Sequence, residues 1–389
     1  MIVAVTGTKG KTTVVSMVNY CLSKLGMTTS SVCTLGLYRG LDRRTKKSPI
    51  PVYDRFFERE MDSDFQCIEI TSRLLRDDMI PNNIADVVVL TGIERGEHEE
   101  IHSLFRDYVE IKRKIYDIRK PKMNALVCSD GLNFSDITQG IENVVTYGFA
   151  EGSDLKIEVK EQTDQYAVLQ FLKDGECFEL VSRVLGKHNY RNLAACYLAL
   201  TELGIESRLA LKKMSKYTGS PGRFERYLAS EHGFGKEKTV IIDYAHTPKS
   251  LRETLTLLRE IYPDEKVCTV FGCGGNKSVT KRPLMGREAT SLSDVVIVAN
   301  DNPRYESAEK IVDDILAGAL IPCIVEMDRE RAISLSLESD CGIILLAGKG
   351  AEEEYKISDK VYINRSDKTL LERVCREKKY ELFPYPKHI

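Results

Sequence analysis

The sequence lacks the features that mark zinc-binding, membrane-spanning and secreted proteins. Its eleven cysteines are scattered, and no CxxC pair begins a zinc site or a redox motif. No apolar run approaches the roughly eighteen residues of a membrane-spanning helix. No signal peptide fits, because a polar glycine-rich loop occupies the N-terminus. These absences predict a protein of the reducing cytoplasm without a membrane partner, in which most cysteines are small buried hydrophobes.

The chain also has little net charge. It contains 56 Lys and Arg against 58 Asp and Glu among 389 residues, a formal net charge of -2. This balance argues against nucleic acid as the partner. The one basic cluster, from Arg39 to Lys47, is typical of a solvated loop, although it could steer an acidic substrate. With 42% hydrophobic and 29% charged residues, the chain is long enough for two or three domains.

The N-terminal stretch predicts a phosphate-binding loop. Ile2 to Thr6 is a short apolar strand, and a helical pattern with apolar residues three and four apart runs to about Leu25. In the turn between them, backbone N–H groups and the helix N-terminus would hold a phosphate. This turn consists of Gly7, Thr8, Lys9, Gly10, Lys11, Thr12 and Thr13. Lys11 would contact the β- and γ-phosphates and Thr12 a magnesium ion. Since the usual pattern has glycine at the place of Val5, an ordinary strand-to-helix turn is the alternative.

Two further apolar segments end in polar residues. A second strand, from Gln66 to Ser72, would leave Glu69 and Ser72 at its carboxyl end, where open parallel sheets bind ligands. A third, from Ala85 to Thr91, leads into a loop rich in acid and histidine that includes His98. Composition alone favours a solvated turn there. If His98 and Glu69 converge on the glycine-rich loop, however, they supply ligands for a divalent metal. In the helix that follows, we expect Lys112 to extend to solvent.

The rest of the chain predicts an α/β protein of two domains. Residues 154–179 alternate as an antiparallel hairpin with its turn at 173–175, and a small-residue helix covers 193–200. The Gly219–Gly222 break divides a mainly parallel P-loop ATPase domain, 1–221, from a doubly wound, Rossmann-like domain, 222–389. In the second domain, polar or glycine-rich loops follow four strands: Thr239–Ile242, Val267–Phe271, Val295–Ala299 and Gly342–Leu346.

Several ordered motifs resemble those of the Mur ligase family, most closely its MurE type, from the N-terminal loop nearly to the C-terminus. Gly7–Thr13 resembles GTNGKTT, Glu69–Ser72 EVSS, Glu97–His98 DH, Gly222–Glu225 GRME, Asp243–Pro248 DYAHTP, and Lys281–Gly286 KRPLMG. Asp301–Arg304 matches the DNPR of members that accept meso-diaminopimelate. Lys112, fourteen positions after His98, matches the lysine that is carbamylated in the family.

The resemblance implies an ADP-forming ligase that joins an amino acid to a small-molecule acceptor carboxylate through an acyl phosphate, in cell-wall or related biosynthesis. It implies ATP and two Mg²⁺ ions as cofactors, with Lys11, Lys112, His98 and Glu69 as catalytic residues. Thr12, Glu69, His98 and a carbamylated Lys112 would be the metal ligands. The protein would be a monomer or a small homo-oligomer.

The resemblance also assigns binding residues beyond the P-loop. The nucleotide would contact Asn189, Asn192, Arg223, Asp243 and His246. The acceptor and the amino acid would contact Ser72, Arg73, Lys277, Asp301, Asn302, Arg304, Gly348 and Glu352.

Three departures from the family pattern concern the substrates. The first strand begins at Ile2, so we expect no N-terminal UDP-binding domain. The family's GDR is Gly275-Asn276-Lys277, in which a lysine point charge replaces the bidentate fork of arginine. The family's GKGHE loses its histidine to Ala351, and Arg73 replaces a histidine. These changes predict an acceptor other than, or in addition to, the standard UDP-muramyl peptide.

Other functions remain open from the sequence. One is an intramolecular cyclising ligase of tetrapyrrole-coenzyme synthesis, and another is a folylpolyglutamate-type ligase. A third is a nucleotide-binding partner subunit that has lost catalysis. Retention of Asp301–Arg304 and Glu352 favours a separate amino-acid substrate over cyclisation, and retention of Lys11, Glu69 and Lys112 favours an active enzyme over a binding subunit.

Overall fold

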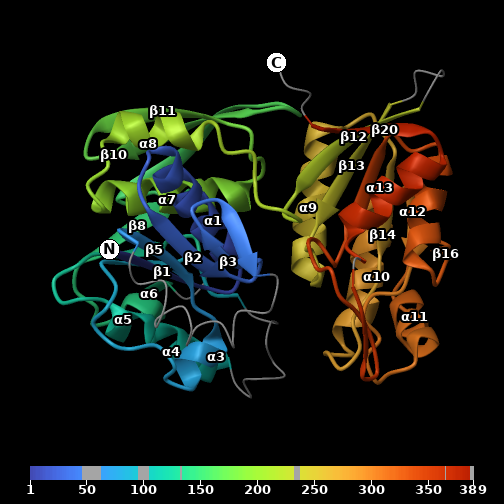
Figure 1. Ribbon diagram of the computed structural model, residues 1–389, viewed down its shortest axis with the longest axis horizontal. Helices are drawn as coiled ribbons and strands as arrows, with labels where there is room; N and C mark the ends of the chain where they lie inside the picture. The colour runs from blue at the N-terminus through green and yellow to red at the C-terminus, as the bar shows by residue number, and fades with distance from the viewer. Residues whose placement is uncertain (46–62, 95–104, 132–133, 232–236, 364, 386–389) are drawn as a thin grey trace. The chain divides into compact units, whose positions relative to one another are not determined.

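The computed structural model describes residues 1–45, 63–94, 105–131, 134–231, 237–363 and 365–385 (Figure 1). The chain divides into two compact units, Met1–Ser220 and Pro221–Ile389. Each unit is an α/β structure built around one large sheet.

The first unit contains an eleven-stranded sheet in the order β11-β10-β9-β8-β7-β6-β1-β5-β2-β3-β4. Neighbouring strands from β2 through β1 to β9 are parallel, and both margins are antiparallel. The central strands are buried along their whole length, because helices cover both of their faces. The strands are β1 (Ile2–Thr6), β2 (Thr29–Cys33), β3 (Gly36–Arg39), β4 (Asp42–Thr45), β5 (Phe65–Glu69), β6 (Val87–Leu90), β7 (Ala125–Cys128), β8 (Val144–Gly148), β9 (Leu155–Gln162), β10 (Ala167–Lys173) and β11 (Glu176–Ser182).

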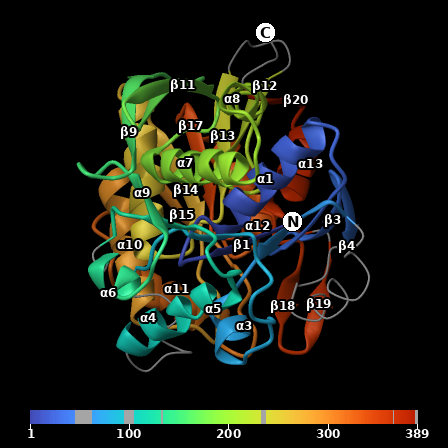
Figure 2. The same cartoon turned by 90° about the vertical axis from the view of Figure 1, so that its left-hand side faces the viewer.

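Two groups of helices cover this sheet, and Figure 2 shows them on its opposite faces. One group packs with the sheet around the apolar cluster that includes Ile68, Val88 and Ile115. It contains α3 (Ser72–Arg76), α4 (Phe105–Arg113), α5 (Ile115–Ile118) and α6 (Phe134–Thr138). The other group contains α1 (Lys11–Lys24), α7 (Lys187–Glu202) and α8 (Ser207–Met214), which pack on one another.

The second unit contains a seven-stranded sheet in the order β16-β15-β14-β17-β13-β12-β20. Its first five strands in this order are parallel, and β12 pairs antiparallel with both β13 and β20. The strands are β12 (Glu225–Glu231), β13 (Glu237–Asp243), β14 (Val267–Phe271), β15 (Val295–Val298), β16 (Ile324–Val325), β17 (Ile343–Ala347) and β20 (Tyr380–Pro384). A separate hairpin, red in Figure 2, consists of β18 (Tyr355–Ile357) and β19 (Lys360–Tyr362).

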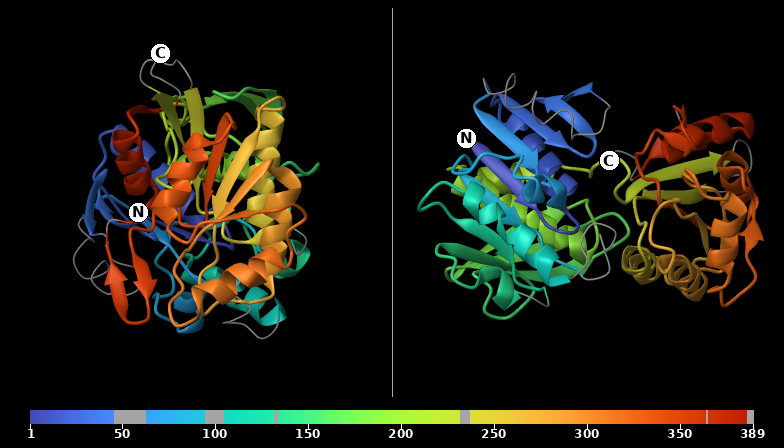
Figure 3. Two further views of the ribbon diagram at one scale, coloured as in Figure 1. Left: turned by 90° about the vertical axis from the view of Figure 1, so that its right-hand side faces the viewer. Right: turned by 90° about the horizontal axis from the view of Figure 1, so that it is seen from below.

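Helices lie on both faces of the second sheet, as the yellow-to-red unit in the left panel of Figure 3 shows. On one face, α12 (Arg329–Glu338) and α13 (Asp367–Glu377) bury Ile333, Leu337 and Leu371 against the strands. The remaining helices pack in a row: α9 (Pro248–Ile261), α10 (Lys281–Leu292) and α11 (Ala308–Leu316). This arrangement brings the loops after β13, β14, β15 and β17 to the carboxyl edge of the sheet.

Several local predictions differ from the structure. Three strands that the sequence pattern did not predict, β2, β3 and β4, precede the predicted strand at Gln66. The first of them, Thr29–Cys33, is fully buried in the sheet although it begins with three polar residues. Strand β5 ends at Glu69, since Thr71 caps a helix in which Ser72 is the first residue. The helix around Lys112 is two helices, α4 and α5, that meet at Lys114.

In the first unit, two further segments are longer than predicted. Residues 155–182 form a three-stranded meander in place of a single hairpin, with one turn at the predicted Asp174 and Gly175. Helix α7 begins at Lys187, so the polar residues that were expected to precede the helix lie within its first two turns.

Candidate functional site

The loop between β1 and α1 has the backbone geometry of an anion site. Gly7 and Gly10 have φ angles of 142° and 84°. A Cβ atom on Gly7 would lie 2.1 Å from Thr91 Oγ1, and one on Gly10 would lie 2.3 Å from Asn192 Oδ1. Gly10 is the N-cap of α1, and no side-chain hydrogen bond caps the helix there, so the helix N-terminus favours a bound anion.

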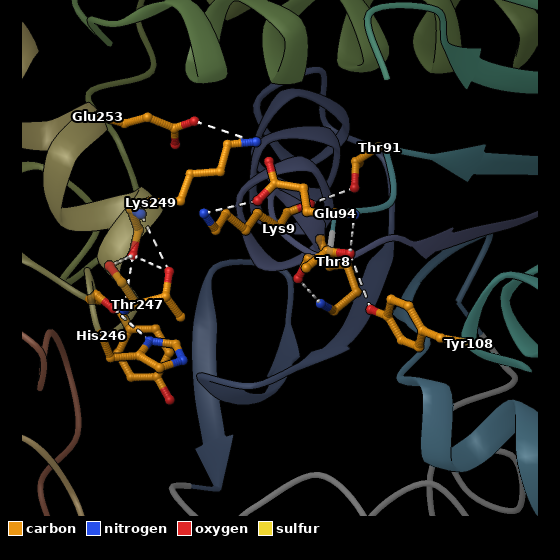
Figure 4. Close-up of polar contacts among 12 residues, drawn as sticks. Thr8, Lys9, Thr91, Glu94, Tyr108, His246, Thr247, Lys249 and Glu253 are labelled. Atoms are coloured by element: carbon orange, nitrogen blue, oxygen red, sulfur yellow. Dashed lines mark hydrogen bonds and ion pairs between the residues drawn. The ribbon is translucent and has the colours of Figure 1, made fainter. Parts of the chain in front are cut away.

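Side chains hold this loop from both directions. Lys11 Nζ donates to the carbonyls of Gly7 at 3.0 Å and Thr8 at 2.9 Å. The Thr8 hydroxyl lies 3.1 Å from the Tyr108 hydroxyl and accepts the Glu94 N–H at 3.0 Å. Lys9 pairs with Glu94 at 3.0 Å, as Figure 4 shows. The loop is therefore held in a fixed conformation with its lysines beside it.

Glu69 connects the loop to the neighbouring strands. Its carboxylate is buried and accepts the Thr12 hydroxyl at 2.8 Å, the Thr34 N–H at 2.8 Å and the Thr34 hydroxyl at 3.0 Å. Thr12 and Glu69 thus place a hydroxyl and a carboxylate together at the start of α1, and these are oxygen ligands of the kind that Mg²⁺ prefers. His98, the one histidine among the predicted metal ligands, lies outside the described residues. Within the described ranges, no three His, Cys, Asp or Glu side chains group as a metal site.

Lys112 is buried, which contradicts the expectation that it extends to solvent. It is 1% exposed, its Nζ donates to the Thr6 hydroxyl at 3.0 Å, and it lies 5.5 Å from the centre of the Tyr108 ring. Desolvation by burial lowers the pKa of Lys112 well below its usual 10.5, the charge of Lys11 lowers it further, and Glu69 opposes the shift. The structure therefore shifts this amine, close to the P-loop, toward its neutral form.

The other predicted residues of the first unit lie on two helices. On α7, Asn189 Nδ2 donates to the Leu185 carbonyl at 2.8 Å, and Asn192 Nδ2 donates to Asn189 Oδ1 at 3.3 Å. Asn192 is the residue that Gly10 approaches, so the start of α7 supports the loop. On α3, Ser72 is buried, whereas Arg73 is exposed and pairs with Asp77 at 3.6 Å.

In the second unit, Asp243 organises the loop after β13. Its carboxylate accepts the N–H groups of Phe224 at 2.7 Å and Ala245 at 2.9 Å. The Arg223 guanidinium lies 4.0 Å from the centre of the Tyr244 ring. His246 Nδ1 lies 2.8 Å from the Tyr244 carbonyl oxygen, and Figure 4 shows His246 beside the Thr247 that caps α9. These contacts leave the Arg223 and His246 side chains half-buried at one edge of the unit.

A second group of predicted residues meets around Glu352. Its carboxylate accepts the Tyr244 hydroxyl at 2.9 Å and Asn302 Nδ2 at 3.3 Å. Burial raises the pKa of Glu352, the charge of Asp301 raises it further, and Lys349 opposes the shift. Gly348 begins the same loop and donates its N–H to the Asp243 carbonyl at 3.0 Å.

The loop after β14 is held by Arg304, which donates from Nη1 to the Gly275 carbonyl at 2.6 Å. The Gly275 N–H in turn donates to the Asn302 carbonyl at 2.8 Å. Lys277 lies exposed at the end of this loop. The structure therefore brings Asp301, Asn302, Arg304, Gly348 and Glu352 to one edge, with Lys277 at its margin.

Sequence reasoning missed several residues that build these two groups. Thr34, Thr91 and Glu94 fix the P-loop and Glu69, and Tyr244 bonds Glu352. The only sequence signal was for Tyr244, which lies inside a recognised motif. Thr34 follows the strand β2 that the pattern did not predict.

No helix in the described part of the chain has the length and apolarity to span a bilayer. All eleven cysteines are free, and most are buried as the sequence predicts.

Comparisons with known proteins identify related chains. Residues 5–200 match the family model described as Mur ligase middle domain, and residues 222–350 match the one described as Mur ligase, glutamate ligase domain. The UDP-N-acetylmuramoyl-L-alanyl-D-glutamate--2,6-diaminopimelate ligase of Prochlorococcus marinus subsp. pastoris is 29% identical over 97% of this chain and 77% of the relative. The enzyme of that name from Neisseria meningitidis serogroup A is 32% identical over 90% of this chain and 72% of the relative.

Solved structures share the fold. A UDP-N-acetylmuramoyl-L-alanyl-D-glutamate--2,6-diaminopimelate ligase superposes with a TM-score of 0.64 at 24% identity, over 98% of this chain and 79% of the other. A MurF ligase from Thermotoga maritima in complex with ADP has a TM-score of 0.66 at 17% identity, over 97% and 79% of the two chains.

Proposed function

The chain belongs to the Mur ligase family and is an ATP-dependent ligase, and from this premise we propose that it joins a diamino acid of the 2,6-diaminopimelate class to the carboxylate of a peptide acceptor. The names of its curated relatives support this substrate class. The observation that carries the proposal is the cluster at the P-loop, where buried Glu69 accepts the Thr12 hydroxyl at 2.8 Å beside Lys11. We assign residues 1–221 to ATP and residues 222–389 to the amino acid.

The proposed reaction has two steps. An acceptor carboxylate oxygen attacks the γ-phosphorus of ATP, and the bond from this phosphorus to the oxygen that bridges to the β-phosphate breaks. ADP departs, and the acceptor is now an acyl phosphate. The amine then attacks the acyl carbon, phosphate departs, and the amine loses a proton as the amide forms. The N–H groups at the start of α1 and the Lys11 ammonium would stabilise the negative charge on the transferring phosphoryl group.

The residues at the P-loop fit a magnesium ion, because Thr12 and Glu69 offer two oxygen ligands on adjacent elements. His98 and a carbamylated Lys112 complete the proposed set for two ions. Bound Mg²⁺ would supply charge neutralisation at the phosphates. The low pKa of Lys112 supports carbamylation, since only a neutral amine adds carbon dioxide.

In the second unit, we propose that Glu352 and Asp301 receive the ammonium group of the amino acid and that Arg304 and Lys277 receive its carboxylate. Arg223, Asp243 and His246 would contact the nucleotide together with Asn189 and Asn192, while Ser72 and Arg73 would contact the acceptor. Free cysteines support a cytoplasmic enzyme. We propose a monomer or small homo-oligomer, which light scattering after size-exclusion chromatography would measure.

Phosphate release tests the proposal. The purified protein would be assayed with ATP, Mg²⁺, bicarbonate and meso-diaminopimelate, with and without UDP-muramyl-dipeptide, beside the Lys11→Ala variant. We expect release that requires both the amino acid and the acceptor and is lost in the variant. Release that needs the acceptor and no amino acid would contradict amide formation with a separate amine and favour a cyclising ligase.

A further inference from the structure

A cavity of about 120 Å³ lies in the second unit at the carboxyl edge of its sheet. Its walls come from the loops after β15, β16 and β17 and from the first turns of α12 and α13. The polar side chains in its lining that matter here are Asn300, Asp328, Arg329, Glu330, Lys349 and Arg365. The residues assigned above to the amino acid, including Asn302, Arg304 and Glu352, do not line it, although Lys349 and Glu352 share a loop.

Two cationic groups of this lining are almost fully buried. Lys349 is 1% exposed, and its Nζ donates to the Glu354 carbonyl at 2.9 Å. Among the described residues, no carboxylate lies within ion-pair distance of this ammonium. The ammonium also lies 6.0 Å from the centre of the Tyr355 ring, and its charge acts on Glu352. Because its hydrogen-bond acceptor is neutral, an anion bound beside it would further stabilise the buried charge.

Arg329 also has one N–H donor without a hydrogen-bond partner in the described part of the chain. The side chain is 7% exposed, and Nε and Nη2 donate to the Asp367 carboxylate at 2.6 and 2.8 Å. Its Nη1 is buried and has no hydrogen-bond partner within the described part of the chain. Since buried donors are nearly always satisfied, this atom indicates a missing acceptor.

The acidic side chains of the lining already have partners. Asp328 caps α12 by accepting the N–H groups of Glu330 at 2.8 Å and Arg331 at 3.1 Å. Glu330 accepts Arg365 at 3.3 Å and Arg373 at 2.9 Å. Both α12, of 10 residues, and α13, of 11 residues, also present their N-termini here, and helix N-termini attract anions.

We propose that this cavity is a binding site for a small anion, held by Arg329, Lys349 and Arg365. The ligand chemistry is a single carboxylate or phosphate group, which would give Arg329 Nη1 its acceptor and Lys349 a further negative charge. Free inorganic phosphate or the carboxylate of a small organic acid could supply this group. Because Lys349 lies in the Gly348–Glu352 loop, the occupant would also help to position Glu352. The residues of this site all belong to the second unit, whereas the P-loop belongs to the first.

Isothermal titration calorimetry of the full chain would test the site. The Lys11→Ala background removes phosphate binding at the P-loop, and inorganic phosphate and glutarate are the two probes. We expect saturable binding of at least one probe in the millimolar range with a stoichiometry near one. Binding of phosphate alone would identify free phosphate as the ligand, and binding of glutarate alone would identify a carboxylate.

Two arginines provide a matched comparison. Arg365 and Arg373 both pair with Glu330 and are similarly exposed, at 41% and 42%, but only Arg365 lines the cavity. We expect Arg365→Ala to weaken binding about tenfold and Arg373→Ala to leave it unchanged. Equal losses in the two variants, or no binding of either probe at about 10 mM, would overturn the proposal. Since Arg365 is partly exposed, its variant should fold, and Lys349→Met gives a second test with melting temperature as its folding control.

Discussion

Each unit buries one lysine at the carboxyl edge of its sheet, and the two differ in what surrounds them. Lys112 and Lys349 are both 1% exposed, and each donates to a neutral oxygen, of Thr6 and Glu354 respectively. Lys112 lies close enough to Lys11 for the second ammonium to add to the effect of burial on its pKa. Lys349 instead borders a cavity and two helix N-termini.

The difference shows two ways in which a fold uses a buried amine. In the first unit, burial and a nearby cation destabilise the protonated form, which supports the proposed reaction of this lysine with carbon dioxide. In the second, space and one unsatisfied donor, Arg329 Nη1, remain beside the lysine, so the arrangement favours a bound anion. Burial alone therefore does not determine the role of a lysine, because the neighbouring charges and the available space decide it.

The largest expected effect is on the P-loop side of the comparison. Lys11→Ala should lower ATP-dependent phosphate release by about 10²–10³-fold, since it removes the cation that stabilises the transferring phosphoryl group. Steady-state phosphate release measures the loss, and circular dichroism checks the fold. Lys24→Ala, at the far end of the same helix, is the matched control and should retain activity. A Lys11→Ala protein with full activity would remove the P-loop from the mechanism.

Lys112→Met separates function from stability. Because the folded-state pKa of Lys112 lies below 10.5, the folded protein binds fewer protons than the unfolded chain in the window between the two values. The free energy of unfolding of the wild type should therefore rise with pH through that window. Above 10.5, the destabilisation caused by burying a protonated Lys112 should disappear. We expect the variant to lose activity in the assay with bicarbonate. In buffer freed of bicarbonate, where Lys112 is a free amine, we expect it to gain about 1 kcal/mol or more in free energy of unfolding near neutral pH. The gain should shrink as pH approaches 10.5.

Urea unfolding at several pH values measures this effect. Lys114→Met is the control, since Lys114 lies just beyond α4 with a side chain that is 39% exposed and pairs with Asp78. Its stability change should be small at every pH. A pH-independent gain in Lys112→Met would show that packing, and not an unfavourable charge, accounts for the stability.

Adjacent glycines test how rigid the second unit's loops are. A Cβ atom on Gly275 would lie 1.9 Å from the Pro303 carbonyl oxygen, whereas one on Gly274 would meet the end of the Arg304 side chain at 2.8 Å. Backbone cannot move aside as a flexible side chain can. Gly275→Ala should therefore destabilise the protein by about 1–3 kcal/mol and Gly274→Ala by less. Similar losses in thermal unfolding would mean that the 301–304 loop adapts easily.

The smallest effect is expected at Glu352. Glu352→Gln should raise KM for the amino acid about tenfold with a smaller change in kcat, because a neutral amide holds an ammonium group less well. Since burial and Asp301 raise the pKa of Glu352, KM of the wild type should rise as pH falls through that pKa. The variant should lack this dependence. A pH profile of KM that is the same in both proteins would exclude Glu352 from contact with the amine.

Some of the site was predictable from local sequence, and some was not. The P-loop was predictable, since an apolar strand, two glycines and a following helix lie within one short stretch. The neighbours of Glu69 were not predictable, because Thr34 follows the strand Thr29–Cys33, which begins with three polar residues and shows neither alternation nor a long apolar run. Lys112 was recognised only through a motif, and its helical pattern predicted the wrong exposure.

The amino-acid sequence by itself determined many of the local elements, the glycine-bearing turns and the family of this protein. These depend on residues close together in the chain, whose backbone preferences and apolar spacing are readable directly. Only the tertiary structure decided that Thr12 meets Glu69 from 57 residues away, that Lys112 is desolvated, and that the buried cations Arg329 and Lys349 border one cavity. The physical reason is that burial, and with it the pKa values and hydrogen bonds of polar groups, depends on which distant segments pack together.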